Sequence, residues 1–133
     1  GGSFLDVGTG TGILAIAAAL LFPQSRIEAC DTDRDAIEIA RENARLNNVQ
    51  ERINFQPGTV TEATVSADLV CANLTADVIA PLLPALVGAT CGRLILSGIL
   101  DSQAGMIHTR LHELGINEVC EVATDGEWVA IIV

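Results

Sequence analysis

Short apolar runs alternate with helical patterns along most of the chain, and each run has the length of a strand. Alternation of this kind is typical of a parallel sheet with helices packed on its faces, so the pattern predicts an α/β fold. Five strands of this sheet are predicted: four at residues 3–7, 26–30, 68–72 and 93–97, and one that begins with residues 53–55.

Four helices are predicted among these strands. Residues 12–22 and 103–114 form the first and the last, the second ends at residues 47–48, and the third carries the apolar residues between 78 and 87. Thr32 or Asp33 can cap the second helix and Thr75 the third, because their side chains accept hydrogen bonds from free backbone donors. Pro81 and Pro84 are expected to kink the third helix or delay its start, since each removes an intrahelical donor.

The end of the chain follows a different pattern. Residues 116–122 and 128–133 are strand-like and flank Asp125-Gly126, a pair typical of a tight hairpin turn. We therefore expect a doubly wound, mostly parallel seven-stranded sheet with a C-terminal antiparallel hairpin, in three α/β/α layers. At 133 residues the chain is expected to form one domain, residues 1–133, around one core.

Composition and charge narrow the possible partners. Half of the residues are hydrophobic, yet no apolar run reaches the roughly 18 residues of a membrane span, and the first residues do not resemble a signal peptide. We therefore expect a cytoplasmic protein that does not contact membranes. The net charge of -10 argues against direct nucleic-acid binding and favours a basic protein partner.

The four cysteines carry no signature of a metal or redox site. Cys30, Cys71, Cys91 and Cys120 lack the short Cys-x-x-Cys spacing. Three of them lie inside or beside apolar strand patterns. All four are expected to be small buried hydrophobic residues.

A glycine-rich turn follows the first strand. A dinucleotide-binding turn would have its third glycine where Ile13 stands, but here that glycine is Gly12. Asp6, two residues before the first glycine, would repel a pyrophosphate and attract a cation. S-adenosylmethionine has no phosphate and carries a sulfonium and an ammonium, so it fits this turn better than NAD. The alternative is a glycine turn with no ligand.

Other polar residues follow the predicted strands. Asp31 ends the second strand, Gly58-Thr59 follows the third, and Asn73 follows the fourth. In an open parallel sheet ligands bind beyond the carboxyl ends of the strands, near the reversal of strand order. These residues and the glycine turn are therefore expected to lie together.

The chain resembles class I S-adenosylmethionine-dependent methyltransferases of the Rossmann-like type. More narrowly, it is similar to the catalytic domain of the bacterial ribosomal protein L11 methyltransferase family. The resemblance is carried by residues 5–18, 30–33, 72–74, 93–100 and 126–129. The first two segments are common to many methyltransferases, whereas Ala-Asn-Leu, Leu-Ser-Gly-Ile-Leu and Gly-Glu-Trp-Val narrow the family.

The resemblance implies roles for individual residues toward the cofactor. The positions implied are Asp6, Gly8, Thr9, Gly10, Asp31, Thr32, Thr59 and Asn73. Asp6 would hold the cofactor ammonium, directly or through water, and Asp31 would accept hydrogen bonds from both ribose hydroxyls. Thr32 would lie against the adenine and Thr59 near its edge. A helix-capping role for Asp31 and no cofactor role for Thr59 are the alternatives.

Asn73 and Leu74 are the implied catalytic residues. The Asn73 amide oxygen and the Leu74 carbonyl would accept hydrogen bonds from the substrate amine and aim its lone pair at the methyl group. The alternative is an asparagine that only ends a strand. Related enzymes acting on planar nitrogens carry Asn-Pro-Pro-Tyr here, so Asn-Leu-Thr-Ala favours an aliphatic amine. Lysine and N-terminal amines of ribosomal protein L11 are the expected acceptors.

The amine must be neutral to attack. For lysine at pH 7 deprotonation costs about 4.6 kcal/mol, and no residue offers itself as an obvious base. We expect proton loss to precede transfer, aided by desolvation and by the sulfonium charge. His108 and His112 could form a metal pair, but no third ligand accompanies them, so no metal site is predicted.

The family also has an N-terminal substrate-recognition domain and a segment before the first strand that helps to enclose the cofactor. Neither is recognised in this sequence. The chain is therefore expected to be a catalytic core that binds cofactor weakly and methylates little protein by itself. A small-molecule methyltransferase, a non-catalytic module that binds cofactor or a partner, and a nicotinamide oxidoreductase are the alternative functions.

Overall fold

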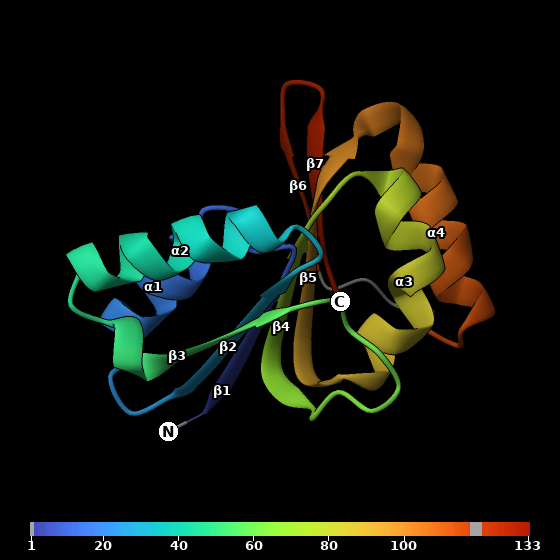
Figure 1. The fold of residues 1–133 in the computed structure, drawn as a ribbon. Helices are drawn as coiled ribbons and strands as arrows, with labels where there is room; N and C mark the ends of the chain where they lie inside the picture. Colours follow the sequence, from blue (N-terminus) through green and yellow to red (C-terminus); the bar gives the residue numbers. More distant parts are fainter. Residues whose placement is uncertain (1, 118–120) are drawn as a thin grey trace.

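One sheet organises the computed structural model, which describes residues 2–117 and 121–133 (Figure 1). Over these residues it has seven strands in the order β3-β2-β1-β4-β5-β7-β6. The strands are β1 Ser3–Val7, β2 Arg26–Asp31, β3 Ile53–Pro57, β4 Ala67–Asn73, β5 Thr90–Leu100, β6 Glu121–Asp125 and β7 Trp128–Ile132. The first five pair in parallel, and β7 is antiparallel to both β5 and β6. The predicted doubly wound sheet with its terminal hairpin is confirmed.

Helices cover both faces of this sheet. α1 (Ile13–Leu21) and α2 (Arg34–Leu46) lie on one face, and α3 (Ala76–Gly88) and α4 (Ala104–Glu113) lie on the other (Figure 1). Short 3₁₀ turns, η1 (Gln50–Arg52) and η2 (Asp101–Gln103), precede β3 and α4. None of the helices in the described ranges is long and apolar enough to cross a membrane.

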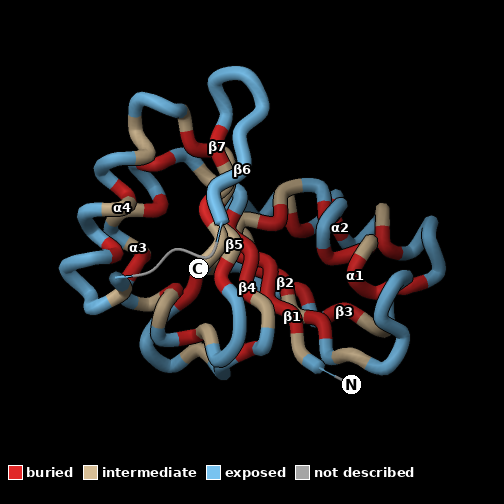
Figure 2. Tube along the Cα trace, turned by 180° about the vertical axis from the view of Figure 1, so that it is seen from behind, coloured by how far each residue is buried: buried red, intermediate tan, exposed pale blue. Residues whose placement is uncertain are grey.

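Buried side chains form two clusters, one for each pair of helices. The cluster beneath α1 and α2 includes Phe4, Ile16, Ile27, Ile37 and Phe55. The cluster beneath α3 and α4 includes Val70, Ile79, Leu83, Leu94 and Ile107. The central strands are buried between these layers, whereas the end of the β6–β7 hairpin is exposed (Figure 2). The central strands, whose carboxyl ends carry the predicted site residues, are thus packed on both faces.

The ends of α2 and α3 test the predicted caps. The Asp33 carboxylate accepts a hydrogen bond from the Asp35 backbone N–H at 2.9 Å, so Asp33 caps α2. Thr75 occupies the cap position of α3, but its side chain makes no capping hydrogen bond there.

The two prolines do not delay α3, so that part of the prediction is wrong. The helix begins at Ala76, directly after Thr75, and runs through Pro81 and Pro84 to Gly88. Its first turn forms because the Thr75 carbonyl accepts hydrogen bonds from two backbone N–H groups. Farther along, completely buried Ile79, Leu83 and Leu86 pack on the sheet, which offsets the two missing donors.

The largest differences from the predicted strand boundaries concern β5 and β6. β5 extends beyond residues 93–97 at both ends, because it pairs with β4 on one side and β7 on the other. β6 begins at Glu121 and includes Asp125, so residues 116–117 are not in it and the hairpin turn is Gly126-Glu127. Residues 118–120 of the predicted strand lie outside the described residues.

Two of the four cysteines are buried as predicted. Cys30 and Cys71 are core residues of β2 and β4. Cys91 is exposed, which contradicts the prediction, because the first residues of β5 lie at the margin of the core. Its thiol donates to an Asp68 carboxylate oxygen at 3.5 Å. Cys120 lies outside the described residues.

Arg52 closes the C-terminal end of α1. Its guanidinium donates to the Ala19 carbonyl and, at 3.0 and 3.3 Å, to the Phe22 and Ser25 carbonyls. The last turn of α1 contains no basic residue of its own. Arg52→Ala is therefore expected to lower the free energy of unfolding by about 2 kcal/mol, measured by urea denaturation.

The matched control for this prediction is Arg110→Ala, at an exposed position of α4. It is expected to change the free energy of unfolding by less than about 0.5 kcal/mol. Equal losses in the two variants would show that α1 does not depend on Arg52.

Candidate functional site

The glycine turn links β1 to α1 at the carboxyl edge of the sheet. The backbone N–H groups of Gly8 and Thr9 both donate to the Cys30 carbonyl at 2.9 Å, which ties the turn to β2. Gly8 has a φ of 77°, and a Cβ at this position would overlap the Leu74 side chain. Glycine is therefore favoured here both by its backbone angle and by the close approach of the Leu74 side chain.

Asp6 is buried beneath this turn. Its side chain is 1% exposed, and one carboxylate oxygen accepts a hydrogen bond from the Thr9 hydroxyl at 2.8 Å. The other oxygen, Oδ1, has no partner among the described residues. The pKa of Asp6 is raised to about 6, mainly by burial and to a smaller extent by repulsion from Asp31, while the Thr9 hydrogen bond opposes the rise. An unpartnered buried carboxylate oxygen is unfavourable, and a ligand with a cationic donor would satisfy it.

Asp31 is the last residue of β2, and each of its two carboxylate oxygens accepts a backbone hydrogen bond. Oδ2 accepts from the Gly10 backbone N–H and Oδ1 from that of Asp33, both at 2.9 Å. Each oxygen keeps a second lone pair for a ligand. Since Asp33 caps α2, the Asp31 side chain is not used as the helix cap.

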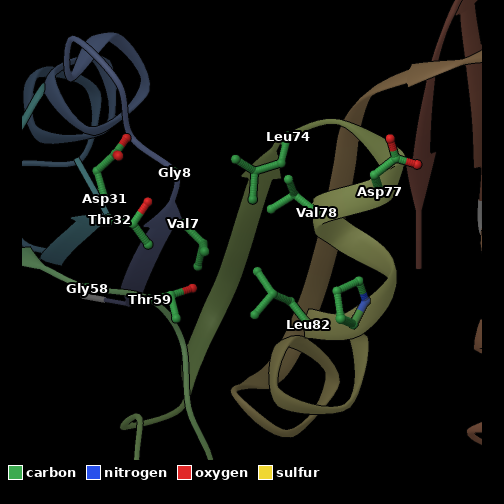
Figure 3. Close-up of a pocket in the computed structure, with 11 residues that line it drawn as sticks. Val7, Gly8, Asp31, Thr32, Gly58, Thr59, Leu74, Asp77, Val78 and Leu82 are labelled. Atoms are coloured by element: carbon green, nitrogen blue, oxygen red, sulfur yellow. The ribbon is translucent and has the colours of Figure 1, made fainter.

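A first cleft of about 400 Å³ opens beside Asp31. Of the predicted cofactor residues, Gly8, Asp31, Thr32 and Thr59 line it. The opposite wall comes from the β4–α3 connection and α3: Leu74, Asp77, Val78, Pro81 and Leu82. Figure 3 shows Thr32 and Thr59 facing Val78 and Leu82 across the cleft. A slot of this volume, with one polar and one apolar wall, suits a nucleoside.

A second cleft of about 530 Å³ adjoins the first at Leu74, which lines both. Asn73, at the end of β4, lies in this second cleft. The other residues that line it are Thr75, Ser97, Gly98, Asp125 and Trp128. Of the two predicted catalytic residues, Leu74 thus lies at the junction of the two cavities and Asn73 lies beside it in the second. One cavity could hold a donor and the other an acceptor.

Not every predicted cofactor residue lines a cleft. Asp6 near the end of β1 and Thr9 in the glycine turn are buried, and the Gly10 backbone N–H donates a hydrogen bond to Asp31. The sequence pattern did not predict the α3 wall, because it indicates Val78 and Leu82 only as apolar residues of the third helix. The position of α3 along the chain could have indicated this wall: α3 begins at Ala76, three residues after Asn73, so its first turns must pass beside the site.

The histidine pair lies away from both clefts. His108 and His112 line a separate cavity on α4 with Asn117. Within residues 2–117 and 121–133, no three His, Cys, Asp or Glu side chains are grouped to hold a metal ion.

The strand order, the glycine turn after β1 and the carboxylate at the end of β2 define the class I methyltransferase fold. The solved structure of a ribosomal protein L11 methylase from Lactobacillus delbrueckii subsp. bulgaricus has a TM-score of 0.89 at 32% identity, covering 98% of this chain and 69% of that one. The chain belongs to the ribosomal protein L11 methyltransferase (PrmA) family, because the model of this family matches residues 1–133.

Curated relatives agree with this assignment. The ribosomal protein L11 methyltransferase of Pelotomaculum thermopropionicum is 42% identical over 134 residues, covering 98% of this chain and 43% of its own length. That of Thermotoga maritima is 39% identical over 134 residues, covering 99% and 50%. The chain thus spans half or less of the length of these relatives.

The fold is also shared with more distant methyltransferases. An RNA methyltransferase from Salinibacter ruber, solved in complex with S-adenosyl-L-homocysteine, has a TM-score of 0.75 at 21% identity, covering 98% of this chain and 78% of that one. At this identity the likeness concerns the fold.

Proposed function

We propose that the chain is the cofactor-binding and methyl-transferring part of a protein N-methyltransferase that acts on lysine or N-terminal amines of ribosomal protein L11. The observation that carries the proposal is the junction at Leu74 of a nucleoside-sized cleft with a second cleft containing Asn73. Membership of the family supports the choice of substrate. A ribosomal substrate would place the activity in the cytoplasm.

S-adenosylmethionine is the cofactor we propose, and it would supply an electrophilic methyl group. Asp6, whose Oδ1 has no partner among the described residues, would hold its ammonium directly or through water, and the fixed Asp31 carboxylate has free lone pairs for two ribose hydroxyls. Thr32 and Thr59 would border the adenine within the first cleft. The backbone of the glycine turn and the N-terminus of α1 would face the methionine carboxylate.

The residues of the second cleft would prepare the amine. Asn73 Oδ1 and the Leu74 carbonyl would accept its two hydrogens, which leaves the lone pair free to point toward the first cleft. An ammonium carries a third proton, for which these two oxygens offer no hydrogen bond. This proton would pass to water before methyl transfer, because desolvation beside the Leu74 side chain disfavours the charged ammonium.

The large acidic excess supports a basic protein partner without direct nucleic-acid contact. The relatives are about twice as long as this chain, and we propose that substrate recognition lies in a part of the full-length protein that precedes it. In the full-length protein, radiolabelled methyl groups are expected on amines of ribosomal protein L11. The 133-residue chain alone is expected to transfer few, and robust turnover by it would contradict the proposed division of roles.

Calorimetric titration of the chain separates the rival functions. S-adenosylmethionine is expected to bind and NAD to show no heat, because Asp6 favours a cation and repels a pyrophosphate. Preferential binding of NAD would favour an oxidoreductase. Binding of S-adenosylmethionine without transfer to L11 by the full-length protein would favour a small-molecule methyltransferase or a non-catalytic module.

A further inference from the structure

Gly98 has an unusual backbone for a residue inside a strand. Its φ is 80°, in the left-handed region, although β5 continues on both sides of it. The pairing of β5 with β7 is irregular at the same place, between Leu96 and Ile99. Irregularities of this kind redirect the chain next to functional sites, and glycine tolerates the conformation best.

Because Gly98 has no side chain, there is room beside it for the two oxygens that we propose as hydrogen-bond acceptors for the substrate amine. A Cβ at Gly98 would lie 2.8 Å from Asn73 Oδ1 and 2.8 Å from the Leu74 carbonyl oxygen. Both distances are shorter than any normal contact of a Cβ, so one or both oxygens would have to move. Asn73 Oδ1 and the Leu74 carbonyl oxygen therefore both lie next to the position that a Gly98 side chain would occupy.

The neighbouring residue, Ser97, holds the backbone of Asn73 and Leu74 against β5. The Leu74 backbone N–H donates to the Ser97 carbonyl at 3.0 Å, and Asn73 pairs with Ser97 in the parallel ladder. The Asn73-Leu74 backbone is thus attached to β5 and cannot retreat easily from a side chain at position 98.

We propose that Gly98 is a positioning residue for methyl transfer. The absence of its side chain lets Asn73 Oδ1 and the Leu74 carbonyl approach the same amine, which orients the lone pair of the nitrogen. The inference rests on the proposed function of these two oxygens. Gly98 touches neither the cofactor nor the acceptor in this role; it acts through the two residues that do.

The test compares Gly98→Ala with Gly115→Ala in the full-length protein. Gly115 has a φ of 86°, and among the described residues no heavy atom lies within 4 Å of a Cβ built there, so Gly115→Ala reproduces the backbone strain without the contact. Gly98→Ala is expected to lower the single-turnover rate at least about 10-fold below that of Gly115→Ala, because misplaced groups slow oriented reactions. Cofactor affinity should differ less than about 3-fold between the variants.

Equal single-turnover rates in the two variants would overturn the proposal. So would a loss of cofactor affinity in Gly98→Ala as large as its loss of rate, because that result indicates general damage to the fold.

A second measurement does not depend on activity. The side-chain amide resonances of Asn73, followed by NMR, are expected to shift in Gly98→Ala and to stay in place in Gly115→Ala. Unchanged resonances in Gly98→Ala would refute the positioning role even if the full-length protein methylated nothing. Absence of transfer in the parent protein, with the Asn73 shift present, would instead reject the proposed function and retain the contact.

Discussion

Replacing Asn73 with alanine in the full-length protein is expected to slow methyl transfer about 100-fold or more, while the affinity for S-adenosylmethionine falls only a few-fold. Asn73 lies in the second cleft, whereas the first cleft is lined by Asp31, Thr32 and Thr59. The variant removes one of the two oxygens that would orient the amine and leaves the first cleft unchanged. Single-turnover methylation and calorimetry measure the two quantities.

The matched control is Asn54→Ala, at an exposed position of β3 whose side chain accepts a hydrogen bond from the exposed Gln56. It is expected to leave both transfer and cofactor affinity within about 2-fold of the parent, as for a typical surface substitution. Methyl transfer that survives in Asn73→Ala would show that the Leu74 carbonyl orients the amine without help.

Replacing Asp6 with asparagine is expected to have two opposite effects. Cofactor affinity should fall about 100-fold, because the unpartnered Oδ1 would no longer offer a carboxylate to the ammonium. The ligand-free protein should nevertheless become more stable at pH 8. The reason is that the pKa of Asp6 is raised from 3.8 to about 6, mainly by burial. Ionisation of Asp6 at pH 8 therefore costs more free energy in the folded state than in the unfolded state.

The pH dependence of this gain follows from the direction of the pKa change. Below about pH 3 Asp6 is protonated in both the folded and the unfolded chain, so its ionisation contributes nothing. Between about pH 3 and pH 7 the unfolded chain ionises first, and the parent loses stability up to about 3 kcal/mol. Urea denaturation of ligand-free parent and Asp6→Asn should therefore diverge as the pH rises and agree near about pH 3.

Asp68→Asn provides a control of opposite sign. Hydrogen bonds from the Ser3 backbone N–H and hydroxyl hold the pKa of Asp68 below its usual value. Ionised Asp68 therefore favours the folded state, and its replacement should lower stability at pH 7, with an effect that disappears under strongly acidic conditions. If Asp6→Asn also lost stability at pH 8, the buried carboxylate would be a structural residue and not a strained ligand group.

The residues that sequence reasoning located well are those whose role depends on a local pattern. The glycine turn lies between a strand and a helix because Gly8, Gly10 and Gly12 take left-handed backbone angles within one short segment. Asp31 and Asn73 could be assigned to one edge because parallel strands expose their carboxyl ends together. These inferences need only the order of the elements along the chain.

Other features depend on contacts between distant segments and could not be predicted. The apolar residues Val78 and Leu82 fit a helix that packs on a sheet, and only the path of α3 past the first cleft places them beside a ligand. The close approach of Gly98 to Asn73 arises from an irregularity in β5 that a strand pattern does not reveal. The start of β6 was wrong for a similar reason: its pairing with β7, not its own apolar residues, determines which segment is extended.

Because Leu74 lines both cavities, the proposed function predicts that the specificities for the methyl donor and the acceptor are coupled. A smaller residue at position 74 would admit bulkier acceptors and would also open the nucleoside slot and uncover the backbone of Gly8. Selection for a new acceptor at this position would thus act on cofactor affinity at the same time. Under the proposed function, changes that admit donors with larger alkyl groups meet the same constraint, and they are better begun at Val78 or Leu82, which line only the first cleft among the cavities described.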